Sequence, residues 1–309
     1  MTRLSLISVF GVCILTLAIV GCGRSKLVGY GWAADHFFNN AQVVQLCGAI
    51  EAGNTERIEE LINDGVDIDA VGRENVTPLL WALMDSQFEC FKLLLEHGAN
   101  PNVELHSHLN ARGEIRPGDS VMQLSAGLRD IRYLETLLDT QGDANLIAET
   151  SGNTVVHRVI ASFARDKKAR IGLLVKHGCN LDVLNNSDFT PAIMAVRLGG
   201  QFGIAVTLLR AGADPLVWGN RSNKRLVHAV AERDINRKGR WRPEAERDFD
   251  ALVVLLEEAG ESMDEAREEV IRWRALFKKL GPGKTRAVIK EERREQKNEA
   301  NAKHDATME

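Results

Sequence analysis

Residues 77–100 read TPLLWALMDSQFECFKLLLEHGAN, and this stretch decides the fold of the chain. Thr77 and Pro78 stand where a helix is expected to begin, because a threonine hydroxyl caps free backbone amides and proline at the first helical position loses no needed donor. Apolar residues follow, and Gly98 comes after the pair Leu94-Leu95. Glycine adopts the left-handed conformation at little steric cost, so Gly98 is expected to end the second helix.

The same unit recurs along the chain. An apolar pair comes before a glycine turn at Gly65, Gly98, Gly142, Gly178, Gly212 and Gly260. A helix start recurs in phase with it, at Thr77-Pro78, Ser120, Thr154, Thr190-Pro191 and Arg225. With a period of about 33 residues, interrupted by insertions, this pattern resembles ankyrin repeats. The resemblance implies an all-α ankyrin-repeat solenoid of about six helix-turn-helix repeats with short β-turn loops, over residues 41–261.

The regions that flank the repeats are expected to cover the two ends of the repeat stack, since a terminal repeat has one face without a neighbour. On the N-terminal side, aromatic residues are placed to cover the core of the first repeat; they are Tyr30, Trp32, Phe37 and Phe38. Residues 262–280 read as an amphipathic capping helix. Residues 281–309 form a highly charged tail, helical or disordered, which we interpret as a solvated segment in preference to a partner-binding arm.

The first 21 residues read as a signal peptide. Arg3 precedes an apolar run from Leu4 to Val20, and Cys22 follows Gly21. This arrangement resembles the lipobox of bacterial lipoproteins, which implies cleavage before Cys22 and lipidation of its thiol. An uncleaved membrane anchor is the alternative. Residues 22–40 are then a linker and N-terminal cap, and the protein is expected in the bacterial cell envelope, lipid-anchored and facing the periplasm, in the outer or inner membrane.

Enzyme chemistry finds little support in the sequence. A net charge of -4 gives no basic footprint for nucleic acid. Residues 281–285 resemble the end of a phosphate-binding loop, but Lys278 stands where the first glycine is needed, so a hinge is expected there. His106 and His108 lack further metal ligands at a recognisable spacing. His157 and His228 occupy helix starts and are interpreted as structural. We therefore expect no enzyme activity, no metal and no cofactor.

The three cysteines of the mature chain form no disulfide framework. Cys47 and Cys90 stand among apolar residues at helical spacing and are interpreted as buried thiols, and Cys179 makes the number odd.

Partner binding is therefore expected on the surface of the solenoid, at the loop tips and the first helices of the repeats. Tryptophan and arginine are over-represented among residues that carry binding energy, which singles out Arg73, Arg112, Trp218 and Arg221. The full set of predicted partner-binding residues is Arg73, Glu74, Trp81, His106, His108, Arg112, Asp188, Trp218 and Arg221.

A narrower resemblance rests on Phe37-Phe38, on residues 46–53 and on residues 72–83 (GRENVTPLLWAL). These segments resemble the corresponding segments of ankyrin lipoproteins that serve as immunity proteins of type VI secretion. The resemblance implies a membrane-anchored periplasmic protein that binds and neutralises a secreted, lipase-like effector. The alternative is an envelope scaffold or assembly lipoprotein that uses its ankyrin repeats to bind other proteins.

Overall fold

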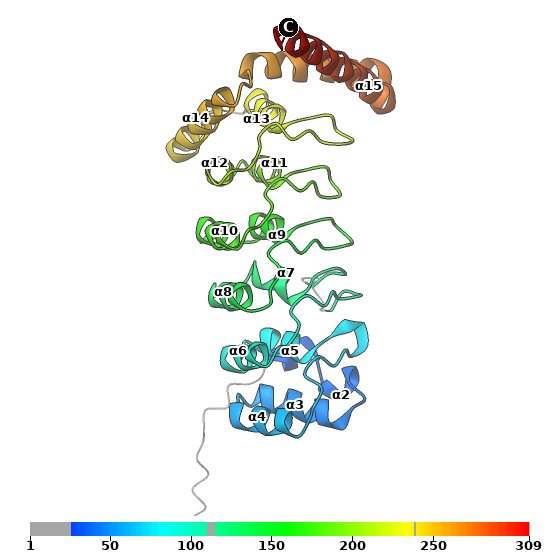
Figure 1. Cartoon of the computed structure of the whole chain (residues 1–309), viewed down its shortest axis with the longest axis vertical. Coiled ribbons are helices and arrows are strands. Elements are labelled where there is room, and N and C mark those ends of the chain that lie inside the picture. Colours follow the sequence, from blue (N-terminus) through cyan, green and yellow to red (C-terminus); the bar gives the residue numbers. More distant parts are fainter. Residues whose placement is uncertain (1–25, 110–114, 238, 309) are drawn as a thin grey trace, which may run out of the picture.

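The computed structural model describes residues 26–109, 115–237 and 239–308 (Figure 1). Within these ranges the regular structure is helical, apart from an isolated β-bridge between Ile147 and Thr154. The predicted signal peptide, Cys22 and Arg112 lie outside the described residues. No helix in the described ranges has the length and hydropathy needed to cross a membrane.

The repeats form consecutive helix pairs, which confirms the all-α ankyrin-type array. The pairs are α3 (Ala41–Glu51) with α4 (Thr55–Asn63), α5 (Pro78–Asp85) with α6 (Phe88–Glu96), α7 (Val121–Ser125) with α8 (Arg132–Asp139), α9 (Val155–Ala161) with α10 (Lys167–Lys176), α11 (Pro191–Arg197) with α12 (Phe202–Arg210), and α13 (Leu226–Ile235) with α14 (Pro243–Glu258). The first helices contact one another along the stack, and so do the second helices. Figure 1 shows these as two rows, with loops projecting from the row of first helices. We call the first helices inner helices and the projecting loops fingers.

The predicted helix starts are confirmed. The hydroxyls of Thr77, Ser120 and Thr190 accept hydrogen bonds from backbone amides three residues later, at 3.2, 3.2 and 3.3 Å. Arg225 has no such hydroxyl at the start of α13. There His228 Nδ1 accepts from the amide of Arg225 itself at 2.9 Å, which fixes the residue that precedes the helix. The hydroxyl caps satisfy amides that would otherwise lack a partner in the first helical turn.

The turn glycines behave as predicted except in the third repeat. Gly65, Gly98, Gly178, Gly212 and Gly260 all have positive φ angles.

Gly142 is not in the left-handed region, so the prediction of a left-handed turn glycine is wrong there. A Cβ at Gly142 would lie 2.7 Å from the carbonyl oxygen of Leu137, and its own amide donates to that oxygen at 2.7 Å. This position therefore needs glycine for a close approach of two backbone segments.

Asparagine and aspartate side chains tie each finger to the next. Each of four carboxylate or amide oxygens accepts from a backbone amide of the following repeat: Asp69 from Asn100 at 2.8 Å, Asn102 from Asp143 at 3.4 Å, Asn145 from Asn180 at 2.6 Å, and Asp182 from Asp214 at 2.9 Å. The fingers consequently form one connected surface, because each finger is hydrogen-bonded to its neighbour.

The N-terminal segment packs on the second repeat as well as the first. It contains α1 (Lys26–Tyr30) and α2 (Ala34–Phe37), and α2 lies beside α3 on the side where the fingers project (Figure 1). The rings of Trp32 and Phe38 lie 5.5 and 6.3 Å from that of Trp81, between ring centroids. Both are buried, whereas Tyr30 is 40% exposed. Trp32 and Phe38 are therefore removed from solvent, whereas Tyr30 is only partly covered.

The C-terminal segment crosses the end of the stack as α15 (Met263–Met308), which bends at Gly281, where φ is 76° (Figure 1). The bend confirms the predicted hinge. Beyond it, Thr285 and Ile289 are buried, so this part of the tail is packed against the protein and our expectation of a solvated segment is wrong.

Candidate functional site

The predicted residues at the first two fingers are accessible. Arg73, His106 and His108 are exposed, and Glu74 is half-buried. The Glu74 carbonyl oxygen accepts from the His106 amide at 3.2 Å, which joins the finger that precedes α5 to the insertion of the second repeat. The Arg73 guanidinium lies 3.5 Å from the His36 carbonyl oxygen. These four residues stay candidates for contact with a partner.

The prediction for Asp188 is wrong, because its side chain is buried inside the stack of fingers. Its carboxylate accepts from the backbone amides of Asn220, Arg221 and Ser222 at 2.7, 3.1 and 2.7 Å. Burial alone would raise the pKa of Asp188, but these hydrogen bonds together hold it below the ordinary value. Asp188 therefore orders the next finger and offers no free oxygen edge to a partner.

The prediction for Trp81 is also wrong. Its side chain is completely buried, and its indole Nε1 donates to Glu51 at 3.0 Å. The ring packs among the aromatic residues of the N-terminal segment, which removes it from solvent.

Trp218 and Arg221 are engaged with their own protein. The half-buried Trp218 ring lies between two guanidinium groups, with Arg225 at 4.4 Å and Arg293 at 4.2 Å from its centroid. Arg221 donates to the Asn186 carbonyl oxygen of the preceding finger. Arg221 is nevertheless exposed, so it can meet a partner, whereas Trp218 is covered by α15.

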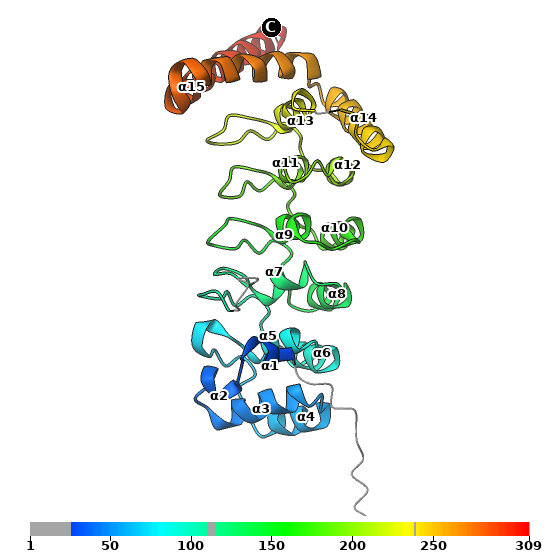
Figure 2. The same cartoon turned by 180° about the vertical axis from the view of Figure 1, so that it is seen from behind.

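A candidate binding surface lies along the inner helices. The residues seven positions after the helix caps share one side of the stack, and we call them the groove row: Met84, Gly127, Ala161, Arg197 and Glu232. Figure 2 shows α1 lying in front of α5 at one end of this side, and α15 crossing the other end. The groove row changes from apolar to charged along the stack.

An apolar hollow occupies the first part of the groove row. Tyr30, Met84, Leu128 and Phe163 line a space of about 450 Å³, which we call the central groove. Phe163, in the connection between α9 and α10, is fully exposed at 102% of its reference area. The short connection between two packed helices keeps the Phe163 ring in water. Exposure of this apolar ring to water is unfavourable, and a partner that covers the ring removes that cost.

A buried arginine fixes the geometry beside Phe163. Arg170 is completely buried, and its guanidinium bonds Asp166 at 2.8 and 3.1 Å. It also donates to carbonyl oxygens at the end of α7, at Ser125, Ala126 and Arg129. The hydrogen bonds from Arg170 lower the pKa of Asp166. The connection that carries Phe163 is thus tied to the preceding repeat, and exposed Arg129 and Arg165 lie along its edge.

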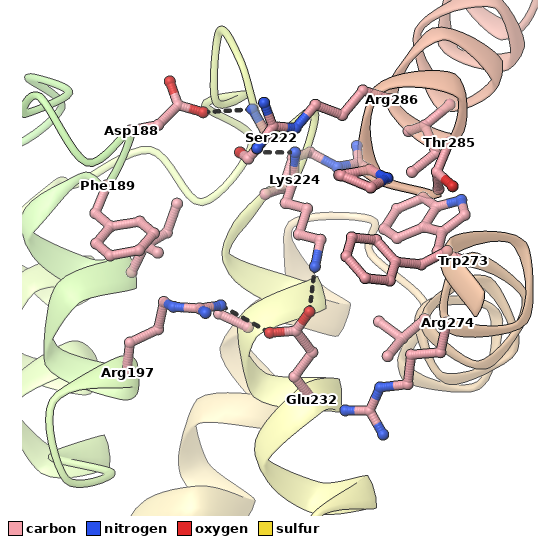
Figure 3. A pocket seen from close by; sticks show the side chains of 17 residues that line it. Asp188, Phe189, Arg197, Ser222, Lys224, Glu232, Trp273, Arg274, Thr285 and Arg286 are labelled. Carbon is pink, nitrogen blue, oxygen red and sulfur yellow. Dashed lines mark hydrogen bonds and ion pairs between the residues drawn. The ribbon is translucent and has the colours of Figure 1, made fainter. Parts of the chain in front are cut away.

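A second hollow lies at the charged end of the groove row, between α11, α13 and α15 (Figure 3). We call this space of about 280 Å³ the terminal pocket. Glu232 stands at its edge and pairs with Arg197 at 2.7 Å and with Lys224. The rest of the wall is largely apolar, from Phe189, Ile193, Ala229, Val270, Trp273, Phe277 and Ile289.

The buried histidines have structural roles, as predicted. His157 Nε2 lies 2.9 Å from the Phe189 carbonyl oxygen, and burial lowers the pKa of His157 to about 4. His228 Nε2 lies 2.8 Å from Glu269, and burial again lowers its pKa. Across the described ranges, no group of three metal-ligating side chains comes together.

The three cysteines among the described residues are free thiols. Cys47 and Cys90 are buried as predicted, Cys179 is half-buried, and burial raises the pKa of all three. Within the described residues their thiols are therefore poor nucleophiles at neutral pH.

The sequence reasoning missed the central groove and the terminal pocket. Phe163 does not stand out in the sequence, because the corresponding connections of other repeats also carry large apolar residues, such as Leu128 and Leu198; its full exposure is seen only in the structure. The sequence could not show that Tyr30 lines the central groove, because α1 reaches it only by folding onto the stack. In the same way, the walls of the terminal pocket come together only when α15 folds onto the last repeats.

The comparisons with known proteins agree with the fold. The family model for ankyrin repeats (three copies) matches residues 34–104. The chain is 25% identical over 171 residues to the ankyrin repeat protein YahD of Escherichia coli strain K12, covering 54% of this chain and 79% of YahD. It is 26% identical over 146 residues to the ankyrin repeat protein FPV024 of fowlpox virus, covering 45% of this chain and 24% of the viral protein. A 226-residue match to the zebrafish (Danio rerio) neurogenic locus notch homolog protein 1 shows 25% identity and covers 68% of this chain and 8% of that protein.

The ankyrin-repeat model thus matches the first part of the chain, and the helix pairs and linked fingers continue the same architecture beyond it. Ankyrin repeats imply a protein-binding module. The match spans 24% of FPV024 and 30% of a second fowlpox virus ankyrin repeat protein, FPV031, so the chain covers less than a third of the length of either relative.

Proposed function

We propose that this ankyrin-repeat protein binds a protein partner along the groove row, with the central groove as the main contact. The observation that carries the proposal is the fully exposed Phe163 ring beside Tyr30, Met84 and Leu128. Exposed apolar patches on soluble proteins mark interaction sites, and aromatic residues are enriched at protein interfaces. Because Arg170 fixes the Phe163 connection, little ordering is needed when a partner binds.

We further propose that the partner is a secreted effector, which the protein neutralises by holding it on the groove row. The sequence resemblance to type VI immunity lipoproteins supports this idea, since its segment 72–83 ends at Leu83 of α5, which lines the central groove. A lipid at Cys22 would hold the stack at the membrane surface, facing the periplasm, where a toxic lipase-like effector arrives.

Capture of partners by the full-length protein tests this function. The detergent-solubilised wild type is compared with Phe163→Asp, which places a charge in the central groove, and with Val254→Asp. Val254 is a matched control because it is apolar and 52% exposed on the outer helix α14. We expect the wild type and Val254→Asp to recover a secreted effector, and Phe163→Asp to lose at least about 90% of it, since substitution of a hot-spot residue costs about 2 kcal/mol or more and about 1.4 kcal/mol is already tenfold.

An envelope scaffold is the alternative, and the same capture separates the two. Recovery of resident envelope proteins alone, with no secreted protein, would favour the scaffold. Equal recovery of any partner by wild type and Phe163→Asp would contradict the assignment of the central groove.

A further inference from the structure

Phe163 lies at the junction of two hollows of different chemistry. One is the central groove, with its largely apolar walls. The other is lined by residues of the α7–α8 connection and of the α9–α10 connection, which belong to neighbouring helix pairs in the stack (Figure 2). Gly127 and Phe163 line both hollows, and a glycine has no side chain that could separate them. An occupant of the central groove can therefore reach the second hollow past the Phe163 ring.

Two arginines line the second hollow. Arg129 and Arg165 are exposed, and neither guanidinium forms an ion pair with a carboxylate of the described residues. We call these two residues the basic edge. The buried Arg170 donates to the backbone carbonyl oxygen of Arg129 at 3.4 Å and to Asp166, which directly follows Arg165. The two connections are therefore fixed relative to one another, and the basic edge keeps its place beside Phe163.

The carboxylates next to the basic edge are already paired with other arginines. Asp130, which follows Arg129 in the sequence, pairs with Arg132 at 2.7 Å. Asp166 also lines the second hollow, but its oxygens accept from Arg170 at 2.8 and 3.1 Å. These two pairs balance their own charges, so the positive charge of the basic edge is left for an anionic group from outside the chain.

The shape of the site favours a side chain over a lipid surface as its occupant. The central groove is a hollow of about 450 Å³ that reaches from Phe163 to Tyr30 of α1 and Met84 of α5. A flat membrane surface can touch the exposed Phe163 ring and the basic edge, but it cannot fill a hollow. A large apolar side chain can enter the hollow and be removed from water there.

We infer that the junction at Phe163 receives an acidic segment of the protein partner. A large apolar side chain of this segment enters the central groove, and aspartate or glutamate side chains beside it lie over the basic edge. Each guanidinium takes a carboxylate of its own through charge-assisted hydrogen bonds. This inference rests on the proposed function and deepens it, because it names the chemistry of the partner segment that the central groove selects.

A peptide of known sequence tests the inference. The probe is Ac-Glu-Glu-Phe-Leu-Glu-Glu-NH₂, whose carboxylates on both sides of the apolar pair allow either chain direction. It is titrated to about 5 mM into the full-length protein in phosphatidylcholine nanodiscs, and a dissociation constant on the order of 1 mM is expected for so small a ligand. The protein carries fluorophenylalanine, and the signal of Phe163, one of ten phenylalanines, is assigned with Phe163→Leu.

We expect the Phe163 signal to shift as the peptide is added. The dissociation constant should rise at least about fivefold when glutamine replaces every glutamate, since exposed ion pairs contribute modestly. Glycine in place of both apolar residues should abolish the shift. No shift with the original peptide, or an equal affinity for the glutamine peptide, would overturn the inference. An equal shift with phosphatidylglycerol vesicles would also overturn it, because a lipid surface would then be the occupant.

Charge reversal in the protein gives the matched control. Arg129→Glu with Arg165→Glu is expected to weaken peptide binding at least about tenfold, because repulsion replaces two attractions. Lys176→Glu with Arg210→Glu makes the same change of charge on the outer helices α10 and α12, where both residues are exposed. This control should bind within about twofold of the wild type. Equal weakening in the two double variants would contradict a role for the basic edge.

Capture of the partner separates this inference from the proposed function. Loss of the partner with Phe163→Asp but full retention with the Arg129→Glu and Arg165→Glu variant would leave the proposed function standing and overturn the role of the basic edge. Full retention with Phe163→Asp would instead contradict the proposed function itself.

Discussion

Asp188 holds three backbone amides of the next finger with one carboxylate. From the sequence, an aspartate at a loop tip looks like a surface residue, because its amide partners lie more than 30 positions away. Trp81 is a similar case, since the aromatic residues that cover it come from the N-terminal segment. At the scale of single residues, contacts distant in sequence decide which side chains stay available for binding.

Asp188→Ala is expected to destabilise the last two repeats. The variant leaves buried amides without an acceptor, which costs about 1–3 kcal/mol. Urea unfolding at neutral pH measures the loss, with exposed Asp250→Ala as the control. A free energy of unfolding equal to that of the wild type would contradict the structural role of Asp188.

The burial of His157 leads us to predict that the protein loses stability in mild acid. Burial lowers its folded-state pKa from 6.5 to about 4, so the unfolded chain binds the proton first as pH falls. Stability from neutral His157 is therefore present above pH 6.5 and is lost as pH falls toward 4, by a total on the order of 3 kcal/mol.

His157→Gln should be less stable at pH 7 and should show a shallower fall between pH 6.5 and 4. Unfolding curves across this range measure it, with exposed His106→Gln as the control. Parallel curves for His157→Gln and wild type would be inconsistent with a buried, neutral imidazole.

At the scale of elements, the inner helices were predictable because their starts carry local chemistry. A threonine or serine hydroxyl, a proline and an apolar run act within one helical turn, and all three can be read in sequence. The second half of α15 was not predictable in this way. Its composition is highly charged, and its packing is seen only in the structure, from the buried Thr285 and Ile289 and from Arg293 on the Trp218 ring.

Ile289→Asp is expected to release the second half of α15. Ile289 is buried, and a carboxylate there lacks a partner, so the packed arrangement becomes unfavourable. Hydrogen exchange should show protection lost over residues 282–295, by at least about tenfold, while α5 and α9 keep theirs. Exposed Lys290→Asp is the control. Unchanged protection in Ile289→Asp would mean that the tail does not depend on this contact.

At the scale of the whole molecule, the period of the sequence determines the architecture. Each repeat contacts its neighbours in both helix rows, and the fingers are linked by side-chain oxygens, so a short repeated unit specifies a long stack. The candidate site was only partly predictable for the same reason. The groove row belongs to the repeats, but the central groove and the terminal pocket also need α1 and α15, which do not repeat.

The two ends of the groove row differ in chemical character. Its first part is apolar around Phe163, and its last part is charged around Arg197 and Glu232. A partner that follows the row is therefore expected to place apolar residues against its first part.

The most direct test of the central claim is photo-crosslinking in living cells from position 163. Phe163 is replaced by a photoreactive phenylalanine analogue, and the same analogue at position 254 serves as the control. The account predicts a crosslink to a secreted effector from position 163 and none from position 254. A partner that crosslinks equally from both positions, or from position 254 alone, would contradict binding along the groove row.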